Sequence, residues 1–372
     1  MFTTTALVLR EINGPFSLEK ISVDAIRNDE ALVEIRATGI CHTDLSCANG
    51  TLPASTPAVL GHEGAGVIKE VGSDITDLKP GDKVLLSYAH CAACEQCISG
   101  HPAYCYSFVQ WNFGGKRPDG STTLSVEDNQ DKKALYSSFF GQSSFARLTI
   151  AHRSSLVKVG DDTNLALFAP LGCGLQTGAG AILNTLDVQP GKTVAIFGVG
   201  PVGMSAVMAA KIRGAKQIIA VDLQQSRLDL AKSLGATATI LGNDADIVSK
   251  IKEISPPNGI HYALDCSGIP AVIETMINCL GTRGRAASVG APSPGKTVGV
   301  DVFSQLIYGR EYVGCCEGDA ISHKLIPFLM EQHAQGKYPI ENLITYYDVK
   351  EFEQAISDTK SGKALKAVLK WT

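Results

Sequence analysis

Four cysteines within fifteen residues constrain this chain more than any other feature. Cys91, Cys94, Cys97 and Cys105 lie in the stretch CAACEQCISGHPAYC, separated by two gaps of two residues and one gap of seven. Zn²⁺ takes four thiolates in a tetrahedral site, and a site closed in this way stabilises structure and leaves no position for a substrate. Three cysteines within seven residues are badly placed to pair with each other in disulfides. The sequence therefore predicts a structural zinc lobe over residues 90–106.

The composition is that of an ordinary soluble globular protein. The chain has 372 residues, of which 45% are hydrophobic and 19% charged, and its formal net charge is −4. This length is enough for two domains with a core each. The acidic balance argues against a nucleic-acid surface and against a basic patch that binds membranes. We therefore expect neither nucleic acid nor a membrane among the partners of this chain.

The cysteines also bear on the cellular compartment, because the chain has 11 of them. The N-terminal stretch MFTTTALVLREINGPF has no basic segment followed by a long apolar run, so it does not resemble a secretory signal. Without export, cysteines are more often metal ligands or reduced core residues than disulfides. We expect a cytoplasmic protein.

Two patterns of predicted secondary structure divide the chain. Short strands and turns dominate the first 90 residues, and residues 111–138 form a polar insertion for which we expect a surface loop. After about residue 175, short apolar strands such as TVAIF and QIIAV alternate with helical stretches such as SRLDLAKSLG. Alternating strands and helices predict a parallel sheet. From about residue 320, two amphipathic helices precede a final strand, KAVLKW.

A glycine motif follows the first of these later strands. Gly198, Gly200 and Gly203 form G-x-G-x-x-G between the strand TVAIF and an apolar helix, and Asp222 ends the next strand 19 residues later. In this context the glycines permit a tight turn and the close approach of a pyrophosphate to the helix N-terminus. Asp222 would accept hydrogen bonds from the adenosine ribose and repel a 2′-phosphate, which favours NAD over NADP. Arg227, five residues further on, is the feature that keeps NADP open.

A second set of candidate metal ligands is spread along the chain. Cys41 follows an apolar, strand-like stretch, His62 lies in GHEGAG, and Cys173 lies in LGCGL. Each alone is explained as an ordinary core residue, but together they offer two thiolates and one imidazole. Three protein ligands leave the fourth position of a zinc ion for water or substrate, as in catalytic sites. Asp44 is placed to orient the His62 ring, and the Thr43 hydroxyl would lie beside the metal for proton transfer.

Five segments resemble, in order, the motifs of the zinc-dependent medium-chain alcohol dehydrogenases: CHTD, GHEGAGVIKEVG, the four-cysteine lobe, LGCGLQTGAGA and GVGPVG. The resemblance covers essentially the whole chain, and NFGGKRPDGSTTLS and FFGQSSFA are closest to the aryl-alcohol (benzyl-alcohol) dehydrogenase branch. It implies an α/β protein with a GroES-like, β-rich catalytic domain and a Rossmann domain, whose doubly wound parallel sheet binds the cofactor. The expected boundaries are 1–176 and 319–372 for the catalytic domain and 177–318 for the NAD-binding domain.

The resemblance also implies roles for individual residues at the catalytic zinc. Its ligands would be Cys41, His62 and Cys173. Glu63 would lie behind the metal and exchange as a ligand, and Thr43 would begin a proton relay.

A further set of residues is implied to contact NAD. His42 and Lys366 would lie at the pyrophosphate, and Thr177 would lie against the nicotinamide. His42 thus carries two implied roles, because the proton relay must also end near it.

Two positions depart from the family pattern. Many relatives carry a histidine three residues after the relay threonine, where this chain has Ser46, so we expect the relay to end on His42. Ser87 stands where several relatives have a bulky aromatic side chain, whereas Phe139 and Phe140 are expected to form aromatic walls. A small residue on one side and aromatic rings on the other predict a substrate larger than ethanol.

These features together predict a zinc-dependent alcohol dehydrogenase with two zinc ions per chain. It would transfer a hydride reversibly between NAD and a bulky or aromatic primary alcohol or its aldehyde. An alternative on the same scaffold is a specialised reductase or dehydrogenase of secondary-metabolite biosynthesis. A regulator without catalysis would lack a ligand or relay residue, yet Cys41, His62, Cys173 and Thr43 are all present. The resemblance further implies a homodimer or homotetramer with a small-molecule alcohol or aldehyde as substrate.

Overall fold

The computed structural model describes residues 2–128, 131–255, 257 and 259–372, and its contacts divide the chain into two compact units. The first unit is the chain up to Cys173, together with Ile321–Phe328 and Ile340–Thr372. The second unit is Gly174–Ala320 together with Leu329–Pro339. The sequence analysis assigned Leu329–Pro339 to the same domain as the rest of the C-terminal segment, whereas its contacts are with the second unit.

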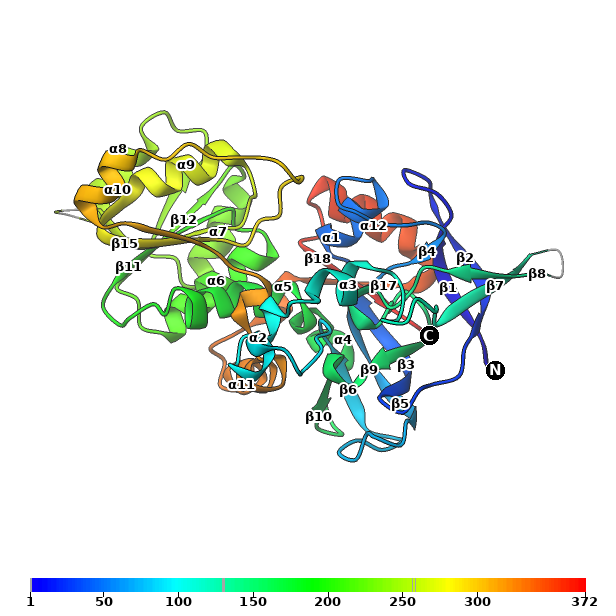
Figure 1. The fold of residues 1–372 in the computed structure, drawn as a ribbon. Coiled ribbons are helices and arrows are strands. Elements are labelled where there is room, and N and C mark those ends of the chain that lie inside the picture. The colour runs from blue at the N-terminus through cyan, green and yellow to red at the C-terminus, as the bar shows by residue number, and fades with distance from the viewer. Residues whose placement is uncertain (1, 129–130, 256, 258) are drawn as a thin grey trace. The chain divides into compact units, whose positions relative to one another are not determined.

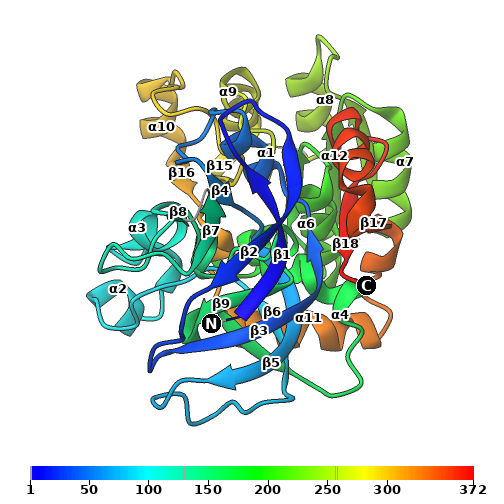
Figure 2. The same ribbon diagram turned by 90° about the vertical axis from the view of Figure 1, so that its right-hand side faces the viewer.

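The first unit is built on two sheets (Figure 2). A five-stranded antiparallel sheet has the order β4-β1-β2-β7-β8. Its strands are β1 (Phe2–Leu9), β2 (Phe16–Val23), β4 (Ala58–Val59), β7 (Leu124–Asp128) and β8 (Asp131–Leu135). The early strands expected from the sequence are therefore present, but the hairpin β7-β8 was not expected.

The second sheet of this unit has seven strands and carries the segments of the candidate metal site. Its order is β10-β6-β5-β3-β18-β17, and β9 also pairs with β3. All pairs are antiparallel except the parallel pair β17-β18. The strands are β3 (Glu30–Gly39), β5 (Glu63–Val71), β6 (Lys83–Leu86), β9 (Leu148–His152), β10 (Leu156–Val159), β17 (Ile344–Asp348) and β18 (Lys366–Lys370). β3 pairs with three strands, and most of its residues are buried, including the polar residues Glu30 and Thr38.

Short helices connect these strands. Helix α12 packs against β17 and β18, as Figure 2 shows. The α-helices are α1 (His42–Ala48), α2 (Glu95–Ile98), α3 (Phe108–Phe113), α4 (Leu165–Phe168), α11 (Ser322–Ala334), whose C-terminal part belongs to the second unit, and α12 (Phe352–Ser361). The 3-10 segments are η1 (Pro102–Tyr104), η2 (Phe139–Gly141), η3 (Arg153–Ser155), η4 (Ala169–Gly172), η7 (Ile340–Leu343) and η8 (Val349–Glu351).

The second unit contains a six-stranded parallel sheet with the order β13-β12-β11-β14-β15-β16 (Figure 1). Numbered from its first strand, this is the order 3-2-1-4-5-6 of a Rossmann fold, so the predicted doubly wound parallel sheet is confirmed. The strands are β11 (Thr193–Phe197), β12 (Gln217–Asp222), β13 (Ala238–Leu241), β14 (Ile260–Asp265), β15 (Leu280–Ser288) and β16 (Glu311–Gly314). Every residue of β11 is buried, as expected for a strand covered on both faces.

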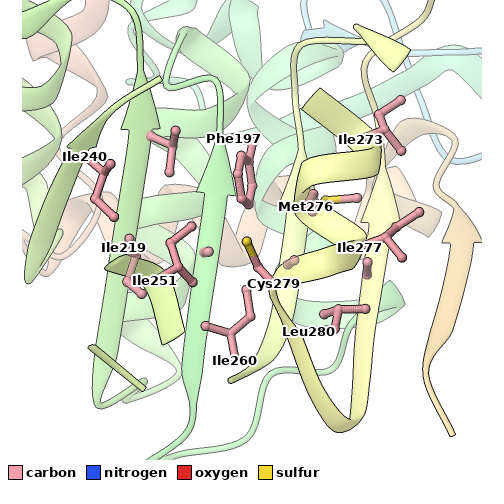
Figure 3. Packing of buried hydrophobic residues seen from close by; sticks show 14 residues of the cluster. Phe197, Ile219, Ile240, Ile251, Ile260, Ile273, Met276, Ile277, Cys279 and Leu280 are labelled. Atoms are coloured by element: carbon pink, nitrogen blue, oxygen red, sulfur yellow. The ribbon is translucent and has the colours of Figure 1, made fainter. Parts of the chain in front are cut away.

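The helices of the second unit pack around this sheet and supply its core. They are α5 (Gly174–Gly180), the π-helical turn η5 (Ala181–Thr185), α6 (Pro201–Ile212), α7 (Gln225–Leu234), α8 (Ile247–Ile254), α9 (Pro270–Cys279), α10 (Val302–Tyr308) and the short turn η6 (Glu317–Asp319). Figure 3 shows Phe197 of β11 beside Met276 of α9, and Ile219 of β12 beside Ile251 of α8, in a cluster that also contains Ile277.

Among the described residues, no single helix is both long enough and apolar enough to cross a bilayer. The helices Leu165–Gly172 and Gly174–Thr185 satisfy the same criteria of length and composition only as a bent pair.

The expectation of a surface loop at residues 111–138 is wrong. This stretch contains the end of α3 and the hairpin β7-β8, which joins the five-stranded sheet through β2. Although this stretch is polar in composition, one of its side chains, Arg117, forms a buried ion pair. Arg117 donates from Nε to Glu30 Oε1 at 2.7 Å and from Nη2 to Glu30 Oε2 at 2.8 Å, and the two side chains are only 3% and 8% exposed. A third hydrogen bond, of 2.9 Å, runs from Nη1 to Asp24 Oδ2.

Removing this buried cation is expected to destabilise the first unit. Arg117→Leu should lower the free energy of unfolding by about 3–5 kcal/mol, because the Glu30 carboxylate stays buried without its partner. Urea unfolding followed by circular dichroism measures the change. Arg36→Leu is the control, since Arg36 pairs with Glu34 while 47% of its side chain is exposed, and it should cost less than about 1 kcal/mol. Equal effects of the two substitutions would show that the buried pair does not stabilise the fold.

Candidate functional site

Four residues from distant parts of the first unit converge on one point. The ligand atoms of Cys41, His62, Glu63 and Cys173 all lie within 4.8 Å of one another. Cys41 immediately precedes α1, His62 and Glu63 stand at the beginning of β5, and Cys173 follows η4. The structure therefore brings together the three predicted zinc ligands and the predicted exchangeable carboxylate.

A buried aspartate, Asp44, holds Cys41 and His62 in position through hydrogen bonds. Asp44 is 0% exposed, and its Oδ2 accepts a hydrogen bond from the Cys41 N–H at 3.0 Å. Its Oδ1 accepts from the Gly61 N–H at 3.0 Å and lies 3.0 Å from His62 Nδ1. With Nδ1–H donating to the carboxylate, Nε2 is the nitrogen left to bind a metal.

The His62 ring carries a polar atom that needs a ligand. Nε2 is buried and has no hydrogen-bond partner among the described residues. An orphaned buried nitrogen beside two cysteine thiols is the donor set of a catalytic zinc ion, for which Cys, His and carboxylate ligands are typical. The residues present therefore fit this metal.

The surroundings of Cys41 favour the thiolate form of its side chain, which is the form that binds a metal. Its hydrogen bond with Cys173, and the charges of Lys366 and His62, lower the pKa of Cys41 well below its usual range although burial opposes them. The thiolate is the form of cysteine that binds metals.

Glu63 is held by a buried ion pair. Lys366 Nζ donates to Glu63 Oε1 at 2.8 Å and Oε2 at 3.0 Å, and to the Ile40 carbonyl at 3.3 Å. Burial raises the pKa of Glu63, and Lys366 opposes this rise. A side chain at Gly39 would collide with Glu63 Oε2, so this glycine makes the room for the carboxylate. Lys366 is 3% exposed, and the pyrophosphate contact expected for it remains a prediction that requires its ammonium group to leave Glu63.

Two buried polar residues, Gln142 and Ser87, form hydrogen bonds with the backbone of the segments that carry the candidate ligands. The role of Gln142 was not predicted from the sequence. Gln142 Nε2 donates to the carbonyls of His62 and Ser87, each at 3.0 Å, and its Oε1 accepts from the Gly64 N–H at 3.1 Å. Ser87 Oγ donates to the Gly172 carbonyl at 2.7 Å, directly before Cys173. A lone glutamine within FFGQSSFA has no pattern that would reveal such a role, because its partners are backbone groups distant in sequence.

The three predicted pocket residues occupy different environments. Ser87 is 0% exposed, and its hydroxyl is engaged with the backbone, so its role as an open wall stays a prediction. Phe140 stacks on the His62 ring at 4.4 Å, and Phe139 meets it edge-on at 5.4 Å. Phe113, which belongs to α3, packs against both phenylalanines. The imidazole is thus enclosed by aromatic rings that exclude water.

The predicted relay residues lie in the first turn of α1. Thr43 is half-buried, with its Oγ1 3.7 Å from Cys41 Sγ, whereas His42 is exposed. Ser46 is half-buried on the same helix. The structure therefore places the hydroxyl beside the metal group and the imidazole at the surface.

The four-cysteine lobe has the dimensions of a structural zinc site. The Sγ atoms of Cys91, Cys94, Cys97 and Cys105 lie within 4.8 Å of one another. Cys97 Sγ is 3.9 Å from Cys91 Sγ and 3.6 Å from Cys94 Sγ. Tetrahedral thiolates about 2.3 Å from zinc are about 3.8 Å apart, so the spacing fits the ion. All the cysteines of the chain are free thiols.

The glycine motif adopts the geometry that a dinucleotide requires. Gly198 has φ +86°, and a side chain at Gly203 would collide with the Gly198 carbonyl. Gly200 is the N-cap of α6, and a Cβ there would have no atom within 4 Å. The second glycine therefore leaves open space at the helix N-terminus, where a pyrophosphate binds.

Asp222 ends β12 beside this turn. Its Oδ2 accepts from the Val199 N–H and its Oδ1 from the Gln224 N–H, both at 2.9 Å. Arg227 Nη1 lies 3.8 Å from Oδ2. The carboxylate is therefore fixed by the backbone, with the arginine close to it. Thr177, the predicted nicotinamide contact, is buried on α5 of the same unit.

Two families match the chain. Residues 27–161 match the alcohol dehydrogenase GroES-like domain, and residues 201–331 match the zinc-binding dehydrogenase family. The first match contains seven of the eight residues of the two metal groups, and the second begins inside the glycine motif.

Named relatives span nearly the whole chain. A geraniol dehydrogenase from Castellaniella defragrans is 39% identical over 98% of this chain and 96% of its own length. The crystal structure of a benzyl alcohol dehydrogenase from Acinetobacter calcoaceticus superposes with a TM-score of 0.96 and 40% identity, and each chain is covered completely. A zinc-binding-domain alcohol dehydrogenase from Burkholderia ambifaria has the same TM-score and 45% identity, over 100% of this chain and 99% of its own.

Identity at this level over entire chains means that these proteins share their fold through common origin. This chain therefore belongs to the zinc-binding alcohol dehydrogenase family, as an oxidoreductase that uses zinc and NAD and acts on the CH–OH group of a small-molecule alcohol.

Proposed function

We propose that this enzyme catalyses reversible hydride transfer between NAD and a bulky or aromatic primary alcohol, with the aldehyde as product. The observation that carries the proposal is the buried Nε2 of His62, which has no hydrogen-bond partner among the described residues and lies close to two thiols, while the imidazole ring stacks on Phe140. A metal-binding nitrogen beside aromatic side chains suits a substrate with an apolar group next to its hydroxyl.

The metal ligands follow from the two groups of donors. Cys41, His62 and Cys173 would hold the catalytic zinc, and Glu63, which pairs with Lys366, would be the exchangeable further ligand. The lobe cysteines Cys91, Cys94, Cys97 and Cys105 hold the structural zinc. When bound, zinc supplies a Lewis acid that lowers the pKa of an alcohol, and NAD supplies the hydride acceptor.

The protein's own residues move the proton. Thr43 Oγ1 accepts the proton that leaves the substrate hydroxyl and releases its own proton towards His42. Support comes from the position of Thr43 beside Cys41 and from the exposure of His42, which can exchange its proton with water. Asp44 holds His62 in one tautomer and one orientation.

Several residues of the chain are proposed to contact the cofactor. Gly198, Gly200 and Gly203 receive the pyrophosphate, and Asp222 accepts the ribose hydroxyls with Arg227 nearby. Thr177 lies against the nicotinamide, and His42 and Lys366 contact the pyrophosphate. In this scheme residues 177–318 are the NAD-binding domain, and residues 1–176 and 319–372 the catalytic domain.

The named relatives support the substrate class. Geraniol and benzyl alcohol are both primary alcohols whose carbinol carbon is attached to an unsaturated carbon. Phe139 and Phe140 are the aromatic surface against which such a group would pack, since both rings contact His62.

We also propose a homo-oligomer, a homodimer or homotetramer, that covers one apolar surface of the second unit. None of the described residues of α10 is buried. Val302, Phe303 and Leu306 are 78%, 72% and 75% exposed, and β16 ends the sheet beside them. An apolar helix next to a terminal strand is typical of an interface between identical subunits.

A cytoplasmic location suits the free thiols, because they persist in reducing compartments.

The protein is expected to contain two zinc ions per chain. Cys173→Ser should lose about one equivalent and all turnover while the fold is retained, because the catalytic site lies on a folded scaffold. Cys97→Ser should lose the other equivalent and lower the melting temperature, because a structural zinc contributes folding free energy. Elemental analysis and thermal unfolding measure both effects. Cys279→Ala, at a buried cysteine outside both groups, should keep both ions, and one equivalent or less in active wild type would refute the two-site assignment.

Loss of the relay hydroxyl should slow chemistry more than binding. Thr43→Val is expected to lower kcat by roughly 10²-fold or more, the usual scale for removing general acid–base help, whereas Thr43→Ser should stay close to wild type. His42→Gln should shift the pH dependence of kcat, and Ser46→Ala should not. Steady-state kinetics across pH test this, and an unchanged profile in His42→Gln would remove His42 from the relay.

Bulky alcohols should be preferred to ethanol. Burying a phenyl group at about 25 cal/mol per Å² corresponds to roughly 10²-fold in kcat/KM, so benzyl and cinnamyl alcohol should exceed ethanol by about that factor. Phe139→Leu should reduce this preference, and Phe328→Leu, at a partly exposed position on α11, is the control. The measurement is NADH formation with each alcohol. Ethanol as good as benzyl alcohol would refute the aromatic assignment, and no turnover of any of them by zinc- and NAD-loaded enzyme would favour the specialised biosynthetic alternative.

A further inference from the structure

Three successive residues of the second unit adopt left-handed backbone conformations. Glu317, Gly318 and Asp319 have φ of +47°, +73° and +46°. Only glycine takes up this region without cost, and bulky residues found there are held by the surrounding structure. Such outliers are common where geometry serves a function.

The turn is held by its contacts with α5 and η5. A Cβ at Gly318 would lie 2.7 Å from the Gln176 carbonyl oxygen and 2.9 Å from Gly180 Cα, so the two segments touch through glycine backbone. Asn184 Nδ2 donates to the carbonyls of Gly318 and Asp319, each at 3.1 Å. These contacts hold the turn against α5 and η5 through backbone groups.

The turn aims the Glu317 carboxylate at the start of α5. Its Oε2 accepts a hydrogen bond from Gln176 Nε2 at 3.2 Å and lies 3.5 Å from Thr177 Oγ1. Gln176 and Thr177 are 0% and 8% exposed. The carboxylate therefore lies against two buried side chains, where charges are screened less than at the surface.

This contact determines the orientation of the Thr177 side chain. An ionised carboxylate only accepts hydrogen bonds, so the Thr177 hydroxyl must direct its proton towards Glu317. Because threonine is β-branched, fixing the hydroxyl also fixes the methyl group. Thr177 is thus held in one rotamer with a negative charge beside it.

We propose that Glu317 is a positioning residue that also favours the oxidised form of the cofactor. The proposal rests on the proposed function, in which Thr177 lies against the nicotinamide. The ring of NAD⁺ carries a positive charge and that of NADH does not, so a nearby carboxylate stabilises bound NAD⁺ selectively.

Binding of both cofactor forms to zinc-loaded enzyme tests the inference. The ratio of Kd for NAD⁺ to Kd for NADH, measured by isothermal titration, should rise about tenfold in Glu317→Gln, the scale of one charge interaction near a protein surface. Glu317→Ala removes the same charge and should raise the ratio in the same direction. Glu317→Asp retains the charge and should stay within about twofold of wild type. Glu253→Gln removes an exposed carboxylate of α8 in the same unit and is the matched control.

The outcomes separate this inference from the proposed function. A ratio that stays constant in both Glu317→Gln and Glu317→Ala, while wild type binds both cofactors, would overturn it and leave the proposed function intact. Equal weakening of NAD⁺ and NADH in both variants would also overturn it, because that is the signature of a purely structural role. Wild type that binds neither cofactor would instead contradict the proposed function. If Glu317→Gln is insoluble, Glu317→Ala decides, with thermal unfolding as the check on folding.

Discussion

The metal site of this enzyme depends on one buried carboxylate. Asp44 receives the N–H groups of Cys41 and Gly61 and faces His62 Nδ1, so a single side chain joins the N-terminus of α1 to the segment before β5. A buried carboxylate without these partners would be strongly destabilising, and therefore the two segments form their contacts together. The direction in which His62 Nε2 points is a consequence of this arrangement.

Around that carboxylate, the site is made rigid by neutral polar groups and by close backbone contacts. Gln142 and Ser87 donate to carbonyl groups next to the candidate ligands, and neither side chain is exposed. At Gly172 a side chain would collide with the Leu86 carbonyl, so the segment that ends at Cys173 can approach β6 only with glycine there. Such support holds donor atoms within the small tolerance that metal chemistry requires.

The second unit combines a regular sheet with one irregular turn. Strand β11 is buried along its whole length, and its Phe197 belongs to the same buried cluster as Met276 of α9. The turn at Glu317–Asp319 departs from regular geometry, and the glycine contact with α5 holds it there. Regular elements thus provide a stable frame, and the strained segment directs a charged side chain.

Local patterns in the sequence determined the family, the parallel sheet, the glycine turn and both sets of candidate ligands. They did so because Cys-x2-Cys spacing and G-x-G-x-x-G act over short distances, where chain geometry leaves few alternatives. The tertiary structure decided the rest. It paired Lys366 with Glu63, engaged Ser87 with backbone, and showed that Arg117 lies in a buried ion pair rather than in a surface loop. These contacts join residues far apart in the chain, and their energies depend on burial, which no local pattern records.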